Sequence, residues 1–307
     1  MAETAFLFPG QGSQHVGMAA PLRHFPEAMD VFERARRSLH WDVFVLCLNG
    51  PGEKLAEDTR AQIAVHVTNC AWAAVLRRMT LRPRVAAGFS LGIFSALVAA
   101  GSLSFEQGLE GVVLAAEEMS REGGKTGGAM AAVIGLSEAE IARICAGVPG
   151  AYLASVNNAK QVVISGREEA VDTALAICEA RGALFAKRLP IRWAIHTPLM
   201  EAASAAFARV VENWSVRPPS FPVLSYLDGE VLADGDRIKR DLSIQFSRPN
   251  DWHKVLLRMK AQRIDTYVEV GPGNTLSRMV RWVERSARVC TVADLLADQA
   301  GDAARVM

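Results

Sequence analysis

The chain has 307 residues, half of them hydrophobic, which is enough for one large domain or two modest ones with a substantial core. Its 34 basic and 33 acidic residues leave a net charge of +1, so bulk charge does not indicate a nucleic-acid-binding protein. Five widely spaced cysteines without a Cys-x-x-Cys pair argue against a disulfide framework or a zinc site. No apolar run approaches the roughly 18 residues of a membrane span, and the N-terminus lacks a basic leader, so we expect a cytoplasmic protein without membrane or nucleic-acid partners.

The N-terminal segment predicts a short apolar strand over residues 4–8 that runs into the turn Pro-Gly-Gln-Gly-Ser-Gln at residues 9–14. Loops at strand ends are where α/β folds build their sites. The glycines of this turn would let the backbone N–H of Gln11 approach a substrate oxygen closely. A Gly/Pro turn with no chemical role explains the same pattern equally well. Residues 20–80 are then predicted to be mostly helical, with a core helix over residues 61–76.

Residues 85–101 predict a strand, a sharp turn and a helix, and the turn carries the pattern Gly-x-Ser-x-Gly at residues 88–92. Flanking glycines allow a tight turn that lifts the hydroxyl of Ser90 out of the sheet. The N–H of Leu91 would then lie at a helix N-terminus, free to face a negative oxygen. Ser90 is therefore a candidate nucleophile, with an ordinary strand-to-helix turn as the alternative.

The middle of the chain predicts a small α+β subdomain inserted into a larger domain. Ser104 and Gln107 form a capping box that begins a helix through about Arg121, and the glycine cluster at residues 123–128 indicates a domain crossing. Strands and helices then alternate, with strands at 129–136, 152–157 and 161–165 and helices at 137–146 and 168–181. The chain returns to the large domain near residues 189–200.

A serine nucleophile needs a base, and histidine is the side chain best matched to remove its proton at neutral pH. His196 is the one histidine at the junction of two predicted elements, so we pair it with Ser90. No acidic residue at a strand end between them completes a Ser-Asp-His order. Further on, residues 267–270 predict a strand, followed by a helix that carries Arg278, Arg281 and Arg285 on one face.

Together these motifs resemble the malonyl-CoA:acyl-carrier-protein transacylases and the acyltransferase domains of fatty-acid and polyketide synthases. The resemblance covers nearly the whole chain. It rests on Phe-Pro-Gly-Gln-Gly-Ser-Gln at 8–14, Gly-Phe-Ser-Leu-Gly at 88–92, Asn157 with Gln-Val-Val-Ile-Ser-Gly at 161–166, His-Thr-Pro-Leu-Met at 196–200, and Glu-Val-Gly-Pro-Gly at 269–273.

The resemblance implies a large α/β-hydrolase-like domain with a parallel-sheet core, residues 1–127 and 194–307, and an inserted ferredoxin-like α+β subdomain, residues 128–193. It implies that Ser90 takes the acyl group, that His196 is the base, and that Gln11 and Leu91 give their N–H groups to the oxyanion. The family orients its histidine by a main-chain carbonyl, and Gln245 matches that position, which accounts for the missing acid. Asn157 is expected among the substrate-binding residues.

The acyl pocket departs from the family pattern at four positions. Phe89 and Ile93 stand where the family usually has histidine and glutamate. Ala115 stands where an arginine normally pairs with the free carboxylate of a malonyl group, and Trp193 replaces a less bulky residue before the histidine. A substrate carboxylate without its partner would cost on the order of 2–5 kcal/mol. Malonyl is therefore a doubtful substrate unless another base, such as Lys187 or Arg192, reaches the site.

Three functions remain open at this point. In the first, Ser90 passes an acyl group from CoA or a carrier to the thiol of an acyl carrier protein. Such carriers are typically acidic, so the helix face with Arg278, Arg281 and Arg285 would bind them. In the second, water accepts the acyl group and the protein is an editing hydrolase of acyl carriers. In the third, which intact Ser90, His196 and Gln11 disfavour, it is an inactive docking protein. The resemblance implies no cofactor beyond CoA or phosphopantetheine thioesters as substrates, and no metal.

Overall fold

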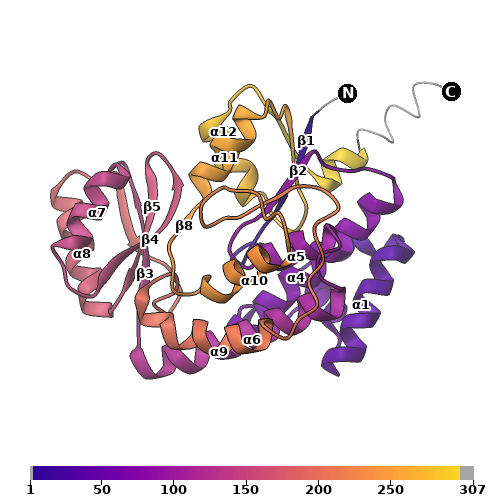
Figure 1. Ribbon diagram of the computed structural model, residues 1–307, viewed down its shortest axis with the longest axis horizontal. Coiled ribbons are helices and arrows are strands. Elements are labelled where there is room, and N and C mark those ends of the chain that lie inside the picture. Colours follow the sequence, from indigo (N-terminus) through magenta and orange to yellow (C-terminus); the bar gives the residue numbers. More distant parts are fainter. Residues whose placement is uncertain (1–2, 298–307) are drawn as a thin grey trace.

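Five short strands form a parallel sheet in the larger part of the molecule, in the order β10-β9-β1-β2-β7 (Figure 1). The structure is a computed structural model and describes residues 3–297. The strands are β1 (Thr4–Phe8), β2 (Val85–Gly88), β7 (Val223–Leu224), β9 (Thr266–Glu269) and β10 (Arg288–Thr291). The first four are buried along most of their length, and β1, β2 and β7 are mainly apolar, as expected where helices cover both faces of a parallel sheet. The parallel core confirms the predicted α/β fold class.

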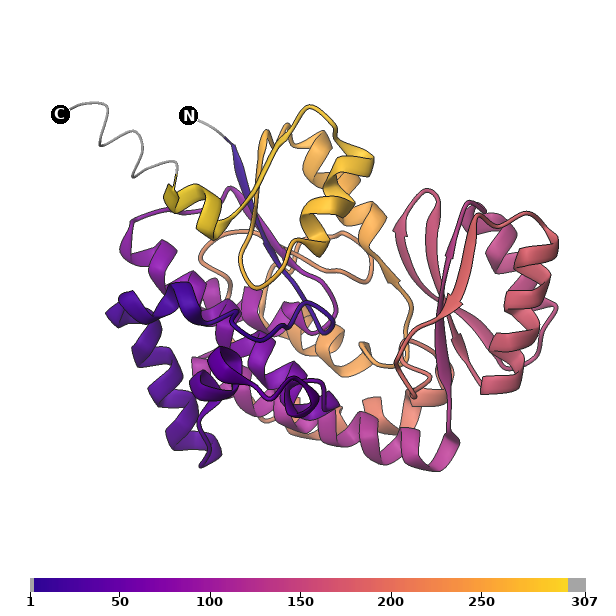
Figure 2. The ribbon, with the colours of Figure 1, turned by 180° about the vertical axis from the view of Figure 1, so that it is seen from behind.

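Helices surround this sheet and account for most of the larger part. They are η1 (Ala20–His24), α1 (Pro26–Leu39), α2 (Val43–Asn49), α3 (Gly52–Leu55), α4 (Asp58–Arg78), α5 (Gly92–Ala99), α6 (Phe105–Thr126), η2 (Pro198–Met200), α9 (Glu201–Val211), α10 (Gly235–Ile244), α11 (Trp252–Ala261) and α12 (Thr275–Val283). The core helix predicted over residues 61–76 is α4, which is buried along most of its length because it packs against α1, α5 and α6. Seen from behind, α1 in indigo lies on the side of the molecule opposite the second sheet (Figure 2).

A second sheet, in the order β6-β3-β5-β4-β8, lies beside the larger part. Its strands are β3 (Ala129–Ile134), β4 (Ala151–Asn158), β5 (Gln161–Gly166), β6 (Phe185–Arg188) and β8 (Asn250–Asp251), and α7 (Glu138–Ala146) and α8 (Glu168–Ala180) cover its outer face (Figure 1). Alternate residues of the central strands point to opposite faces. Ala131 and Val162 belong to the core under α7 and α8, whereas Met130 and Val163 face the larger part.

The β8 strand is a feature that the sequence did not reveal. It is only two residues long and comes from the C-terminal third of the chain, yet it pairs parallel to β4, with Asn250 beside Ser155. The second sheet therefore combines four strands of the predicted insertion with one strand from the chain that follows it. Residues 1–2 and 298–307 of the predicted large domain lie outside the described residues.

The glycine cluster at residues 123–128 was expected to follow the end of a helix near Arg121. In the structure α6 continues to Thr126, so the first glycines of the cluster lie inside the helix. A Cβ at Gly123 would lie 2.1 Å from Cε3 of Trp193, so this glycine makes room for an indole ring instead of ending the helix. The crossing follows at Gly127, which has a left-handed φ of 63°. There the outgoing and returning segments lie side by side, since a Cβ at Gly128 would lie 2.5 Å from the backbone nitrogen of Ala194.

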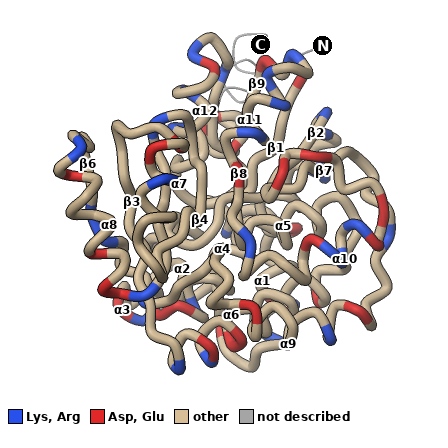
Figure 3. Tube along the Cα trace, turned by 60° about the vertical axis from the view of Figure 1, so that its left-hand side comes forward, with Lys and Arg blue, Asp and Glu red and all other residues tan. Residues whose placement is uncertain are grey.

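Most charged residues lie on the surface of this fold, and the cysteines lie in its interior. Basic and acidic residues are interspersed over the outer helices in the view of Figure 3. All five cysteines are buried, as the sequence predicted. Within residues 3–297, no helix combines the length and the apolar character needed to cross a membrane.

Candidate active site

The turn between β2 and α5 holds Ser90 in a left-handed backbone conformation, with φ of 51°. Such a conformation is uncommon for a residue with a side chain and has to be held by its surroundings. The flanking glycines make the turn possible. A Cβ at Gly88 would lie 2.1 Å from the carbonyl carbon of Gly92, and a Cβ at Gly92 would lie 2.0 Å from the carbonyl oxygen of Phe8. The Gly-x-Ser-x-Gly pattern is thus explained by backbone contact on both sides of the serine.

His196 reaches Ser90 from the segment that returns from the second sheet. Its Nε2 lies 3.1 Å from Oγ of Ser90, across 106 positions of sequence. Its Nδ1 donates to the main-chain carbonyl of Gln245 at 2.8 Å, which fixes the tautomer that leaves Nε2 free to accept a proton. The backbone supports this arrangement, because the N–H of His196 donates to the carbonyl of Phe246 at 2.7 Å.

His196 is enclosed by the protein and is 5% exposed. Burial lowers its pKa to about 4, although hydrogen bonds with the backbone of Gln245 and Arg248 act in the opposite direction. The ring is therefore neutral at pH 7. A neutral imidazole that contacts a serine hydroxyl can act as a general base.

The loop after β1 lies directly against the serine turn. A Cβ at Gly10 would lie 2.6 Å from the carbonyl oxygen of Phe89 and 3.7 Å from the backbone nitrogen of Leu91. Asn69 Nδ2 donates to the carbonyl of Pro9 at 2.9 Å and holds the loop in place. Within residues 3–297, the backbone N–H groups of Gln11 and Leu91 donate no hydrogen bond. Both are free to face an oxyanion beside Ser90.

A cavity of about 460 Å³ opens at Ser90 between the larger part and the second sheet. It is lined by eight of the ten residues expected in the site, which are Gln11, Phe89, Ser90, Leu91, Ala115, Asn157, His196 and Gln245. The second sheet contributes the inward-facing residues of its central strands, among them Met130 and Val163. The cavity wall is thus built from residues that follow β2 of the first sheet and from residues of the second sheet.

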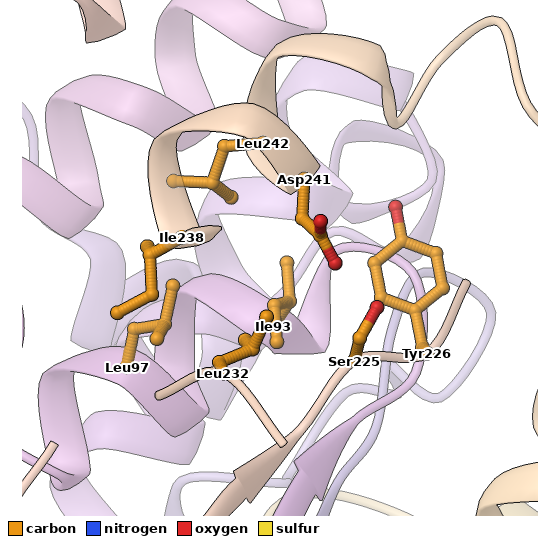
Figure 4. A pocket seen from close by; sticks show the side chains of 8 residues that line it. All are labelled: Ile93, Leu97, Ser225, Tyr226, Leu232, Ile238, Asp241 and Leu242. Carbon is orange, nitrogen blue, oxygen red and sulfur yellow. The ribbon is translucent and has the colours of Figure 1, made fainter. Parts of the chain in front are cut away.

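Two of the expected pocket residues lie elsewhere. Ile93 points to the other side of α5, where it packs with Leu97 and Leu232 beneath α10 (Figure 4). Successive residues of a helix are rotated by about 100° around its axis. The next residue, Phe94, therefore faces the cavity in place of Ile93. Trp193 also does not line it. Its ring lies against Gly123 and its indole N–H donates to the carboxylate of Asp58 at 3.2 Å.

Several polar residues of the cavity were not indicated by the sequence. Among them are Asp58 and Gln62, which are four apart on α4 and so share one helix face. Asp58 also accepts from the side chain of Gln11 at 2.8 Å. Lys187 and Arg192, the bases considered as replacements for the missing arginine, do not line the cavity. No group of three or more His, Cys, Asp or Glu side chains in the described part of the chain could hold a metal ion.

The sequence of residues 5–305 matches the acyl transferase domain family. The chain belongs to this family. Malonyl CoA-acyl carrier protein transacylase of Escherichia coli strain K12 is 35% identical over 286 residues, which cover 92% of this chain and 93% of that protein. Polyketide biosynthesis protein ThaF of Burkholderia thailandensis is 36% identical over 284 residues, 90% of this chain and 24% of that longer protein.

Solved structures of the family have the same fold as this acyl transferase domain. The malonyl CoA-acyl carrier protein transacylase of Coxiella burnetii superposes with a TM-score of 0.92 at 34% identity, covering 95% of this chain and 94% of that one. A malonyl-transacylase solved in complex with a type II polyketide synthase acyl-carrier protein has a TM-score of 0.90 at 32% identity, covering 94% and 95%. The fold expected from the resemblance is confirmed.

Proposed function

We propose that the protein is an acyltransferase of fatty-acid or polyketide biosynthesis that moves an acyl group without a terminal carboxylate to the thiol of an acyl carrier protein. The donor is a thioester of CoA or of another carrier. Family membership and the names of the relatives support acyl transfer to a carrier protein. The chemistry of the cavity supports the restriction on the acyl group.

In the proposed first step, His196 Nε2 takes the proton of Ser90 Oγ as that oxygen attacks the thioester carbonyl carbon. The resulting oxyanion faces the N–H groups of Gln11 and Leu91. The carbon–sulfur bond then breaks, the leaving thiolate takes the proton from His196, and an acyl-serine remains. In the second step the carrier thiol gives its proton to His196 and attacks the ester, and Ser90 leaves with that proton. Atoms and charges balance without a cofactor.

The observation that carries the choice of acyl group is the charge of the cavity wall. Among the described residues that line it there is no lysine or arginine, and Asp58 is its one carboxylate. A malonyl carboxylate in this cavity would lose hydration without gaining a cation, at a cost of about 2–5 kcal/mol, and Asp58 would repel it as well. Burying a methylene group instead stabilises by about 0.8 kcal/mol. Both terms favour acetyl, longer alkanoyl or aryl-acyl groups.

Hydrolysis is the second candidate, and the same observation favours it. The described lining residues include no Lys or Arg for malonyl, whereas Oγ of Ser90 lies 3.1 Å from Nε2 of His196, within reach for proton transfer. The same acyl-serine could then pass its acyl group to water and release it from a carrier. A third possibility, an inactive docking protein, has no support from this geometry.

Intact mass spectrometry distinguishes these functions. The protein is mixed with malonyl-CoA, acetyl-CoA, butyryl-CoA and benzoyl-CoA, and the added mass on Ser90 is followed with and without holo acyl carrier protein. Acyltransferase activity predicts an uncharged acyl adduct that survives in buffer and moves to the carrier on its addition. Loss of the adduct in buffer at the same rate with and without carrier would identify a hydrolase. Preferential malonyl loading would overturn the proposed acyl specificity.

A further inference from the structure

Asn69 lies in the interior of α4, and its side-chain amide joins two segments of the candidate site. Its Nδ2 donates to the carbonyl of Pro9 at 2.9 Å and to Oγ of Ser95 at 3.2 Å. Pro9 belongs to the loop after β1, and Ser95 belongs to α5. Asn69 is 0% exposed and is not among the described residues that line the cavity. It can therefore act on the site only through the segments that it holds.

The loop after β1 needs an anchor of this kind. Gln11, whose N–H is proposed to face the oxyanion, lies between Gly10 and Gly12, and glycine restricts the backbone little. Pro9 has no N–H, so its carbonyl is the one backbone group by which this residue can be held. The donor from Asn69 is buried and comes from the middle of a 21-residue helix, which gives the loop a rigid support.

Ser95 and His66 fix the direction in which the Asn69 amide points. Ser95 Oγ accepts from Asn69 and lies 2.9 Å from Nδ1 of His66. Burial lowers the pKa of His66 to about 3, so the ring is neutral and can accept the hydroxyl proton of Ser95. All three residues are 0% exposed, so the network is shielded from solvent. Both donor contacts of the amide are thus set by the core.

The oxygen of the same amide has no such partner. Asn69 Oδ1 is buried without a hydrogen bond to any residue in the described part of the chain, and a Cβ at Gly271 would lie 2.0 Å from it. An unpaired buried oxygen destabilises a fold, so stability alone does not account for an asparagine at this position. Its two donor contacts, one to the loop and one to α5, do account for it.

We propose that Asn69 is a positioning residue for the acylation of Ser90. The two N–H groups that would bind the oxyanion belong to separate segments: Gln11 to the loop, and Leu91 to the start of α5, one turn before Ser95. Asn69 holds both segments with one amide group and so sets the separation of the two N–H groups. Oxyanion stabilisation depends on donors that are fixed before the reaction. This inference rests on the proposed acylation of Ser90 and adds to it a residue outside the cavity.

The test compares the parent protein with Asn69→Leu, which keeps the branched shape of the side chain but donates no hydrogen bond. Single-turnover acylation by the acyl-CoA that loads the parent fastest should slow by about 10- to 100-fold, the range expected when a group of the site is displaced. The inhibition constant of trifluoroacetonyl-CoA, a ketone that forms an oxyanion adduct with a serine, should rise by a similar factor. The Kd of S-butyl-CoA, which has no carbonyl, should stay within about twofold.

Thr68→Val is the matched control. Thr68 is the neighbouring residue of α4, is 0% exposed, and its hydroxyl faces Sγ of Cys47 at 4.0 Å and not the loop after β1. This variant removes a buried polar group from the same turn of the helix, and its acylation rate and inhibition constant should match those of the parent. Circular dichroism shows which variants are folded.

Three results overturn the positioning role: acylation by Asn69→Leu at the parent rate, an equal loss in Thr68→Val, or an equal weakening of trifluoroacetonyl-CoA and S-butyl-CoA. If Asn69→Leu does not fold, Ser95→Ala decides, because it removes the tie to α5 and should weaken trifluoroacetonyl-CoA but not S-butyl-CoA. Failure of the proposed function is a separate outcome. A parent protein that forms no acyl-serine overturns both, whereas normal acylation by Asn69→Leu removes only the role of Asn69.

Discussion

The Nδ1 of His196 is bound to the main-chain carbonyl oxygen of Gln245 at 2.8 Å, where a serine hydrolase triad would place a carboxylate. A carbonyl dipole orients the ring and selects its tautomer but brings no full negative charge. It therefore opposes the effect of burial on the imidazole pKa only in part, and the pKa stays at about 4. We therefore expect His196 to act as a base that is fixed in position and weak.

The first prediction is an acylation rate that is insensitive to pH near neutrality. Because burial lowers the pKa of His196 to about 4, its neutral form predominates above that value. The single-turnover acylation rate constant should stay level from pH 8 to about 5 and fall as the pH approaches 4. A rate that halves near pH 6.5, the ordinary value for histidine, would contradict this assignment.

Stability has to be followed in the same experiment. A histidine with a lowered pKa in the folded state binds its proton more readily in the unfolded chain, so folding weakens as pH falls below about 6.5. His66, buried in the core, adds to this effect because burial lowers its pKa to about 3. Circular dichroism at each pH shows where the protein remains folded, and only those points enter the rate profile.

The second prediction concerns the acyl-serine. Ser90→Ala should carry no acyl mass after incubation with an acyl-CoA that modifies the parent. His196→Ala should slow acylation by roughly 10² to 10⁴, the usual size of a general-base contribution. Intact mass and rapid-quench kinetics measure the two effects. Turnover by the alanine variant of Ser90 at the parent rate would remove this residue from the mechanism.

The third prediction concerns a substitution that places a cation at the position where the family has an arginine. Ala115→Arg should raise the ratio of malonyl to acetyl loading by about tenfold or more, because a buried charge pair replaces an unpaired carboxylate. Ala115 is 1% exposed but lines the cavity, so the new side chain has space to enter. Ala115→Gln adds a long polar side chain without a charge and should leave the ratio low. Efficient malonyl loading by the parent, with no gain from the arginine, would mean that another cation holds the carboxylate.

The fourth prediction separates two neighbouring glycines of α6. Gly123→Ala should lower the free energy of unfolding by about 1–3 kcal/mol, because its Cβ would collide with the ring of Trp193. At Gly124 a Cβ would meet no atom within 4 Å. Gly124→Ala should therefore stabilise the helix by about 0.5–1 kcal/mol. Urea unfolding measures both values, and equal effects at the two positions would show that Trp193 does not pack as described.

The fifth prediction concerns carrier docking at α12. Thr275 and Met279 of this helix line the cavity, while Arg278 and Arg281 are exposed and Trp282 is 65% exposed. Acidic carriers should dock against these arginines. Reversing Arg278 and Arg281 to glutamate should raise the apparent KM for carrier without changing acylation from CoA. Arg209→Glu on α9, at the opposite end of the molecule in Figure 1, is the matched control, and equal KM changes would count against docking at α12.

The sequence predicted those features that depend on short local patterns. The glycines around Ser90 and the position of His196 at an element junction were sufficient to pair two residues 106 positions apart. Gln245 acts through its backbone carbonyl, so no side-chain pattern marks it and only the family resemblance indicated it. Ser104 and Gln107 form the capping box that their spacing predicted.

Other features depend on three-dimensional packing. Ile93 was expected in the cavity because it is close to Ser90 in sequence, but the turn of α5 directs it away. Arg285 was expected on the same helical face as Arg278, yet α12 ends at Val283. Gln62 belongs to a helix correctly predicted as core. A periodic apolar pattern does not show which part of such a helix borders a cavity.

The pairing of β8 with β4 connects the second sheet to His196, the proposed base. Asn250 in β8 lies five positions after Gln245, the residue whose carbonyl holds His196. If the second sheet opens locally, this ladder breaks and the support of Gln245 loosens with it. Amide hydrogen exchange in β4 and loss of the reactive imidazole orientation should then share one opening event. Packing of the second sheet and orientation of the His196 ring are thus linked through five residues of backbone.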